Sequence, residues 1–231
     1  MSRTVIVVGG TTGIGRAIAE GFAATGDTVT ATGHELPGDR ADGIAFAQLD
    51  VRDGAGVEAF FAPFARIDVL VNAAGVILRG GAEFTPAGFA DVVDINLNGT
   101  QRCCAAAHPA LKAAGGCVIN IASMLTFFGS PTSPAYAASK GGIGQLTKSL
   151  AVAWAPDRIR VNALAPGWIS TALTRALGED RERSRAILQR TPMGRWGQPG
   201  DLAGPALFLA SDAAGFVTGA ILPVDGGYSA V

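Results

Sequence analysis

Short apolar runs alternate with longer mixed segments along the whole chain. Several of these runs are apolar at nearly every position, which is typical of parallel strands covered on both faces. They predict seven strands, at residues 4–9, 27–33, 44–51, 68–75, 117–123, 158–165 and 221–224. Helices are predicted between them at residues 13–25, 54–64, 89–114, 136–155 and 200–211. The alternation predicts an α/β fold, with one doubly wound parallel sheet and helices on both faces, forming a single domain over residues 1–231.

Two irregular segments interrupt the alternation. Residues 126–134 read TFFGSPTSP, and residues 168–198 contain a helix candidate dense in Arg and Glu that is followed by RTPMGRWGQ. Both segments follow predicted strands, and ligands of open parallel sheets bind beyond the carboxyl ends of the strands. Because long irregular segments are usually lids or binding loops, we expect both to border the ligand site.

Composition excludes several classes of protein. Charged residues make up 16% of the 231 residues, the net charge is -1, and no Lys/Arg stripe is present, which argues against nucleic-acid binding. No run of about 18 apolar residues and no signal-peptide layout occur, so the sequence predicts no membrane partner and a cytoplasmic location. The three cysteines predict reduced core thiols. His34 and His108 are too few and too far apart in sequence to indicate a metal site.

A glycine-rich turn follows the first predicted strand and opens a helix. It reads Gly9-Gly10-Thr11-Thr12-Gly13-Ile14-Gly15. Glycines let a pyrophosphate approach the backbone, and the helix N-terminus attracts its negative charge. An ordinary tight turn is the alternative, but the position between a first strand and a helix favours a dinucleotide-binding loop.

A second constellation lies in the middle of the chain. Tyr136 and Lys140 are four residues apart on a predicted helix, and therefore on one helix face. A nearby cation favours a phenolate over a phenol, whose ordinary pKa is about 10. Ser123 ends a predicted strand, where its hydroxyl can hydrogen-bond a substrate oxygen. A Tyr–Lys pair alone is usually a surface pair, so the interpretation depends on its coincidence with Ser123 and the glycine loop.

Over essentially its whole length the chain resembles the short-chain dehydrogenase/reductase family. The resemblance rests on the order and spacing of Gly9-x-x-x-Gly13-Ile14-Gly15, Asp50, Asn72-Ala73-Ala74-Gly75, Asn96, Ser123, Tyr136-x-x-x-Lys140, Pro166-Gly167 with Thr171, and Val224-Asp225-Gly226-Gly227. It implies a Rossmann-like fold and an NAD(P)-dependent oxidoreductase that moves a hydride between a nicotinamide cofactor and a secondary alcohol or ketone. It also implies a homotetramer or homodimer.

The resemblance assigns roles residue by residue. It makes Tyr136 the catalytic acid/base and Lys140 the residue that binds the nicotinamide ribose and lowers the pKa of Tyr136. Ser123 would orient the substrate, and Asn96 would hold a water in the proton relay behind Lys140. The implied cofactor contacts are Gly9, Thr11, Thr12, Gly13, Ile14, Gly15, His34, Asp50, Val51, Asn72, Ala73, Ala74, Gly75, Tyr136, Lys140, Pro166, Gly167, Ile169 and Thr171.

Three positions depart from the family pattern. Val8 stands where a Thr is usual and Ala73 where an Asn is usual. Gly33 ends the second predicted strand, where NAD-dependent members usually carry an Asp that binds the ribose 2′-hydroxyl. The cofactor is therefore either NAD or NADP. Glu35 would repel a 2′-phosphate and position 12 is not basic, so the sequence leans toward NAD.

Alternative functions stay open at this point. A fold does not imply chemistry, so a non-catalytic dinucleotide sensor or scaffold is one alternative, and a methyltransferase on a similar sheet is another. Among enzymes, the substrate could be a 3-oxoacyl thioester, a hydroxy acid, a sugar or a cyclic alcohol. Four arginines could contact an acidic substrate, although a solvated helix face with neighbouring acids is the better interpretation; they are Arg175, Arg181, Arg183 and Arg185. Nine apolar residues predict an apolar substrate pocket, with core or interface positions as the alternative: Leu125, Phe127, Phe128, Trp168, Ile169, Leu173, Leu177, Met193 and Trp196.

Overall fold

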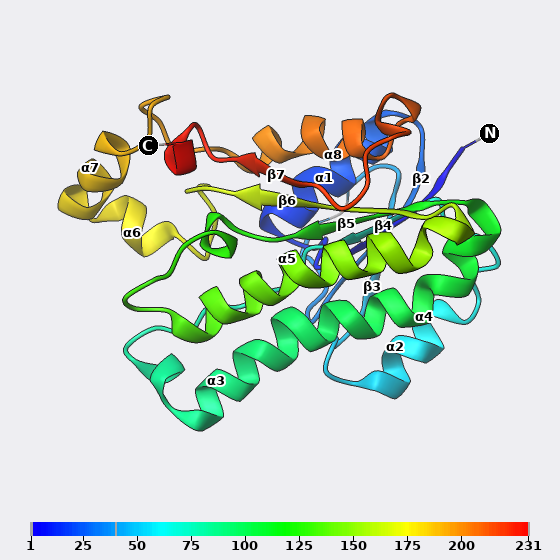
Figure 1. The fold of residues 1–231 in the computed structure, drawn as a ribbon, viewed down its shortest axis with the longest axis horizontal. Coiled ribbons are helices and arrows are strands. Elements are labelled where there is room, and N and C mark those ends of the chain that lie inside the picture. The colour runs from blue at the N-terminus through cyan, green and yellow to red at the C-terminus, as the bar shows by residue number, and fades with distance from the viewer. Residues whose placement is uncertain (1, 40, 231) are drawn as a thin grey trace.

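A seven-stranded parallel sheet forms the centre of the molecule (Figure 1). The computed structural model describes residues 2–39 and 41–230. The strand order β3-β2-β1-β4-β5-β6-β7 reverses direction between β1 and β4, as in a doubly wound fold, which confirms the predicted architecture. The strands are β1 Thr4–Val8, β2 Thr28–Gly33, β3 Ile44–Gln48, β4 Val69–Asn72, β5 Cys117–Ile121, β6 Arg160–Pro166 and β7 Ile221–Val224.

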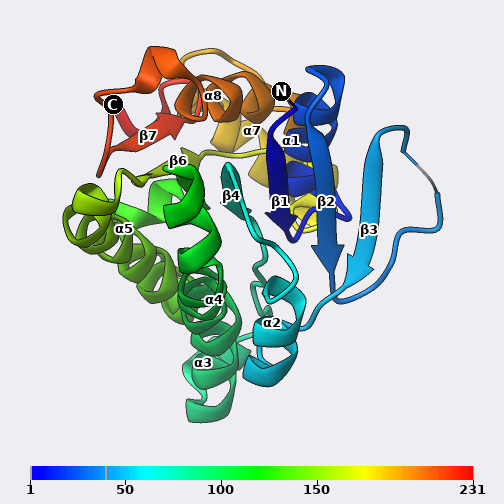
Figure 2. The same cartoon turned by 90° about the vertical axis from the view of Figure 1, so that its right-hand side faces the viewer.

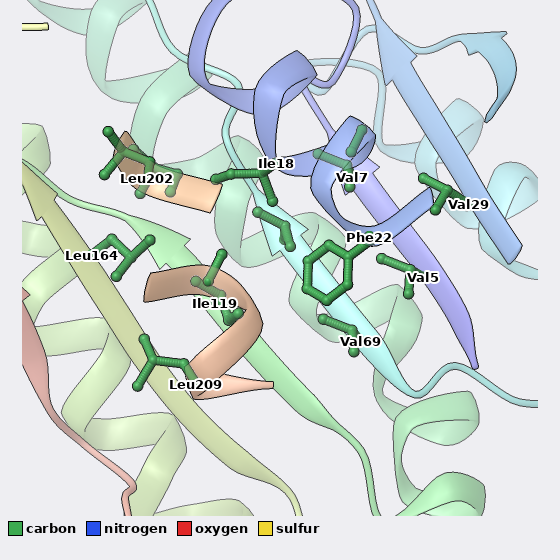
Figure 3. Close-up of a cluster of buried hydrophobic side chains, with 14 of the residues drawn as sticks. Val5, Val7, Ile18, Phe22, Val29, Val69, Ile119, Leu164, Leu202 and Leu209 are labelled. Carbon is green, nitrogen blue, oxygen red and sulfur yellow. The ribbon is translucent and has the colours of Figure 1, made fainter. Parts of the chain in front are cut away.

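Helices cover both faces of the sheet (Figure 2). One face carries α1 (Gly13–Ala24) and α8 (Ala203–Leu209), whose side chains pack with inward residues of β1, β4 and β5. Figure 3 shows this layer, in which Phe22 and Ile18 of α1 lie over Val5 and Val7. The opposite face carries α2 (Gly54–Phe61), α4 (Gly99–Ala114) and α5 (Pro134–Trp154). Within the described residues, no helix combines the length and apolar character that crossing a membrane requires.

The predicted helix at residues 89–114 is interrupted in the structure. Its first part is α3 (Pro86–Val93), and a π-helical turn at Asp94–Asn98 joins it to α4. Such turns are frequent at functional sites, and this one places the fully buried Asn96. The predicted helix at residues 200–211 is a 3₁₀ turn, Pro199–Leu202, followed by α8. The Arg- and Glu-rich segment forms two short helices, α6 (Arg175–Glu179) and α7 (Arg181–Gln189).

A gap in hydrogen bonding lies along one row of the sheet. Val8 is in register with Thr32 on β2 and with Asn72 on β4, so the three side chains share one face. Thr32 Oγ1 and Asn72 Oδ1 are buried and have no hydrogen-bond partner among the described residues. The hydroxyl that Val8 lacks relative to the family pattern would lie between these two atoms.

A Val8→Thr variant should therefore be more stable than the wild type by about 1 kcal/mol, because one hydroxyl can accept from Thr32 and donate to Asn72. Urea unfolding measures the difference. Val7→Thr is the matched control, since Val7 points to the other face among buried apolar side chains and its new hydroxyl should destabilise the fold. Equal destabilisation of both variants would contradict the explanation.

Candidate active site

A cavity of about 740 Å³ opens at the carboxyl ends of the central strands. It runs from the loop after β2 past the glycine loop to the first turn of α5. Fifteen of the predicted cofactor contacts line it: Gly9, Thr11, Thr12, Gly13, Ile14, Gly15, His34, Asp50, Val51, Ala73, Ala74, Gly75, Tyr136, Lys140 and Thr171. Residues that the sequence did not single out as contacts also line it, among them Pro37, Arg52, Val76 and Ile121.

Four predicted cofactor contacts lie outside the lining of this cavity. The Asn72 side chain points into the protein and donates to Asn120 Oδ1 at 2.9 Å. Pro166 is buried at the end of β6, and Gly167 packs so closely on Asp225 that a Cβ would meet its backbone at 2.7 Å. Ile169 is 4% exposed and bridges to Gly197. Contacts of these four residues with a cofactor remain predictions.

The glycine loop is packed against the segment after β4. Gly9 has a φ of +77°, and a Cβ there would collide with the backbone of Ala74. A Cβ on Gly15 would collide with the carbonyl oxygen of Gly9. Helix α1 then begins with no side-chain cap from Thr12 and no acidic residue in its first turn. The cradle and the open helix N-terminus fit a pyrophosphate, because both present backbone N–H groups to an anion.

The segment after β6 covers part of this loop. Thr171, Ala172 and Leu173 line the cavity, and a Cβ on Gly13 would lie 3.6 Å from Thr171 Cγ2. Of the segment at residues 168–198, the structure thus brings residues 171–173 to the cavity, whereas residues 126–134 do not line it. Of the predicted apolar pocket residues, Leu173 is the one that lines it. Trp168, Ile169 and Met193 line a separate cavity of about 390 Å³, and the four arginines of α6 and α7 are exposed.

Lys140 is a buried cation at the inner end of the main cavity. Its side chain is 4% exposed, and Nζ donates a hydrogen bond of 2.6 Å to the carbonyl oxygen of Ile121 at the end of β5. Burial lowers the pKa of Lys140 to about 8, because removal from water disfavours the charged ammonium. The Nζ lies 5.6 Å from the centre of the Tyr136 ring.

Tyr136 meets Ser123 next to this cation. Burial raises the pKa of the Tyr136 phenol, and a hydrogen bond with Ser123 opposes this rise. The negative charge of Glu83 raises the pKa further, whereas the positive charge of Arg79 lowers it. Ser123 starts a 3₁₀ turn, Met124–Thr126, where its Oγ accepts from the backbone N–H of Leu125 at 3.1 Å. Because the pKa of the phenol lies above its ordinary value, Tyr136 is protonated at neutral pH in this structure.

Asn96 connects the same helix to the loop after β4. Its Oδ1 accepts from Val76 N–H at 2.8 Å, and its Nδ2 donates to the Val76 carbonyl and to Ser139 Oγ, both at 3.0 Å. Ser139 in turn donates to the carbonyl of Tyr136 at 2.7 Å. The structure thus brings all four predicted catalytic residues together. The predicted water behind Lys140 remains a prediction, because the Asn96 amide already has protein partners.

Sequence reasoning missed two charged residues at this site. The buried carboxylate of Glu83 accepts hydrogen bonds from the backbone N–H of Tyr136 and of Leu78, each at 2.9 Å. Arg79 is exposed, and its guanidinium donates to the carbonyl of Leu173 at 3.1 Å. Neither residue belongs to a recognisable local motif, so no signal in the sequence singled them out.

The shifted pKa of Lys140 makes a prediction about stability. In the unfolded chain the ammonium pKa returns to about 10.5, so between pH 8 and 10.5 the unfolded state binds more protons and stability rises with pH. The Lys140→Met variant should therefore have a larger free energy of unfolding than the wild type at pH 7.5. This difference in free energy should shrink by about 2 kcal/mol between pH 7.5 and pH 9.5. Lys148→Met, on an exposed position of α5, should show no such trend. A Lys140→Met difference that is constant with pH would exclude a cation titrating near pH 8.

The sheet is doubly wound, and the uncapped N-terminus of α1, which can bind an anion, lies beside the point between β1 and β4 where the strand order reverses. This arrangement defines a dinucleotide-binding α/β protein. Comparison with known proteins narrows this class. A family model described as "Enoyl-(Acyl carrier protein) reductase" matches residues 8–229. The chain belongs to the short-chain dehydrogenase/reductase family and is an NAD(P)-dependent oxidoreductase that acts on CH–OH groups. The expected family and reaction class are confirmed, and neither the sensor nor the methyltransferase alternative is retained.

Relatives with described activities cover nearly the whole chain. A 2-dehydro-3-deoxy-D-gluconate 5-dehydrogenase of Pseudoalteromonas atlantica is 45% identical, over 98% of this chain and 95% of its own length. A galactitol 2-dehydrogenase (L-tagatose-forming) of Cereibacter sphaeroides is 40% identical, over 96% and 93%. Among solved structures, a gluconate 5-dehydrogenase of Burkholderia cenocepacia in complex with NADP and tartrate has a TM-score of 0.91 at 35% identity, over 100% and 97%. NADP in that structure means that the lean toward NAD is not confirmed.

Proposed function

We propose that this enzyme interconverts a secondary hydroxyl and a ketone on a sugar acid of the 2-dehydro-3-deoxygluconate type, with Tyr136 exchanging the proton. The observation that carries the proposal is the meeting of Tyr136 and Ser123 with the buried Lys140 at the inner end of the cavity. The carboxylate in the substrate is supported by Arg79 and by the names of the similar proteins.

The roles follow from the chemistry of each side chain. A bound nicotinamide supplies the hydride for reduction or takes it up in oxidation. In reduction the protonated phenol of Tyr136 gives its proton to the ketone oxygen, while the Ser123 hydroxyl donates to the same oxygen. In oxidation the phenolate of Tyr136 takes the hydroxyl proton, and Lys140, while it is protonated, would lower the cost of that phenolate. Lys140 and the glycine loop would also hold the cofactor.

Arg79 supplies a positive charge for the substrate. Within residues 2–39 and 41–230 its guanidinium has no carboxylate partner, and its hydrogen bond goes to the neutral carbonyl of Leu173. The positive charge of Arg79 also interacts with Tyr136 and lowers the pKa of its phenol. An anionic group on the substrate would pair with this arginine, which is held beside the cavity by its hydrogen bond to Leu173. An alditol or a neutral sugar offers no such group.

We propose NAD as the preferred cofactor. At Gly33 a Cβ would collide with the Thr11 side chain, so the acidic side chain that is usual in NAD-dependent members would fit here only if Thr11 moved. Among residues 2–39 and 41–230, Arg16 and Arg52 near the loop after β2 are already paired, Arg16 with Glu20 and Asp39, and Arg52 with Asp50, whose pKa that pairing lowers to about 2. A 2′-phosphate would have to compete with these carboxylates, whereas a 2′-hydroxyl would not.

The reaction is tested by turnover on a panel containing 2-dehydro-3-deoxygluconate, galactitol and a 3-oxoacyl thioester, each with NAD(H) and NADP(H). The sugar acid with NAD(H) should give the highest kcat/KM. Tyr136→Phe should lower kcat by about 10²- to 10⁴-fold and change the dissociation constant of the cofactor far less, because the ring is kept and only the proton-exchanging hydroxyl is lost. Undiminished turnover in Tyr136→Phe would refute the assigned role, and a preference for the thioester would refute the substrate class.

Arg79→Met separates charge recognition from the chemistry. Loss of a charge-assisted hydrogen bond to the carboxylate should raise the KM for the sugar acid by about 10-fold or more, whereas the KM for a neutral polyol should change little. Steady-state kinetics on both substrates measure the two effects. Equal changes for the charged and the neutral substrate would show that Arg79 does not recognise the carboxylate.

A further inference from the structure

Glu83 is a buried carboxylate that the reaction described above does not use. It lies in the 3₁₀ turn Ala82–Phe84, is 1% exposed, and forms no ion pair with any described residue. A charge buried without a counter-ion costs several kcal/mol unless hydrogen bonds offset the cost. A buried acid without a pairing cation therefore calls for a local explanation.

The first part of that explanation is the start of α5. Ser133 precedes this helix but gives it no side-chain cap, and Pro134 at its first position has no N–H. Tyr136 is the third residue of the helix, and its free N–H donates to Glu83 Oε2 at 2.9 Å. A carboxylate at this place is favoured by the helix dipole and satisfies an orphan donor. Glu83 thus caps the helix directly at the backbone of the catalytic tyrosine.

The second part is the loop after β4. The other oxygen of Glu83 accepts from Leu78 N–H at 2.9 Å. Leu78 lies between Val76, which lines the cavity, and Arg79, which reaches over to Leu173. Both carboxylate oxygens therefore accept a hydrogen bond, one from the loop after β4 and one from the start of α5. A glutamine could serve only one of the two N–H groups, since its other terminal atom is a donor.

We infer that Glu83 is a positioning residue that fixes the start of α5, and with it Tyr136, relative to the loop at residues 76–79. Its negative charge also opposes ionisation of the phenol. The inference rests on the proposed role of Tyr136 as the acid/base. Two charges therefore have opposing effects on the phenol, with Glu83 favouring the acid form and Arg79 favouring the phenolate.

Two variants of Glu83 separate its charge from its geometry. Glu83→Gln removes the charge and one hydrogen bond. The pH-independent kcat for alcohol oxidation should therefore fall about 10-fold. The limb of the kcat–pH profile that rises as Tyr136 ionises should move to lower pH. Glu83→Asp keeps the charge but shortens the reach, so kcat should fall while the limb stays near its wild-type pH. Glu58→Gln, which removes an exposed carboxylate on α2, should match the wild type in both respects. Active sites are counted by cofactor titration, so that partial misfolding does not pass for a lower kcat.

A measurement without substrate keeps this test independent of the proposed reaction. The chain has two tyrosines, so in a Tyr228→Phe background the tyrosinate absorbance reports Tyr136 alone. In this background Tyr136 of the Glu83→Gln variant should ionise at a lower pH than Tyr136 of its parent. Circular dichroism over the same pH range shows whether each protein stays folded or at which pH it unfolds. An unshifted titration, or an equal shift in Glu83→Asp, would overturn the inference even if the sugar acid is turned over. Absence of turnover on every substrate together with a shifted titration would instead refute the proposed function alone.

Discussion

The burial of the Lys140 ammonium beneath the end of β5 is the interaction on which the site depends. A cation in this position needs an acceptor, and the Ile121 carbonyl supplies it only because the strand ends there. Four residues earlier on the same helix face, Tyr136 is brought within the field of that cation. The helix that carries both residues must be fixed along its axis, and Asn96 through Ser139 and Glu83 through the Tyr136 backbone supply that restraint.

The cofactor side of the cavity depends on close backbone packing. The glycine loop lies against the segment after β4, so that strands β1 and β4, on either side of the switch point, share one rigid wall. The same segment continues into the loop that carries Val76 and Arg79. The wall that would hold the dinucleotide and the loop that would meet the substrate are therefore one stretch of chain. Small displacements of this stretch would alter cofactor and substrate positions together.

Much of this arrangement is predictable from sequence because it follows local patterns. The seven apolar runs, the glycine spacing after β1 and the Tyr136–Lys140 spacing each carry their own signal, and the structure brings these residues together. Glu83 and Arg79 carry no such signal, since Glu83 meets Tyr136 across 53 residues of sequence and Arg79 meets Leu173 across 94. The π-helical turn at Asp94–Asn98 was missed because one extra residue in a helical turn barely changes the hydrophobic pattern. Pro166, Gly167 and Ile169 do not line the cavity and Gly167 packs closely on Asp225, so their contacts with a cofactor stay predictions.

One cavity should hold the dinucleotide and present the substrate oxygen to Ser123 and Tyr136. A crystal structure of the Tyr136→Phe variant with NAD and 2-dehydro-3-deoxygluconate tests it most directly, because the complex cannot complete the proton exchange. The account predicts the dinucleotide between the glycine loop and Lys140, a substrate oxygen at hydrogen-bond distance from Ser123, and the substrate carboxylate on Arg79. A dinucleotide outside this cavity, or a substrate whose reacting oxygen lies away from Ser123, would contradict it.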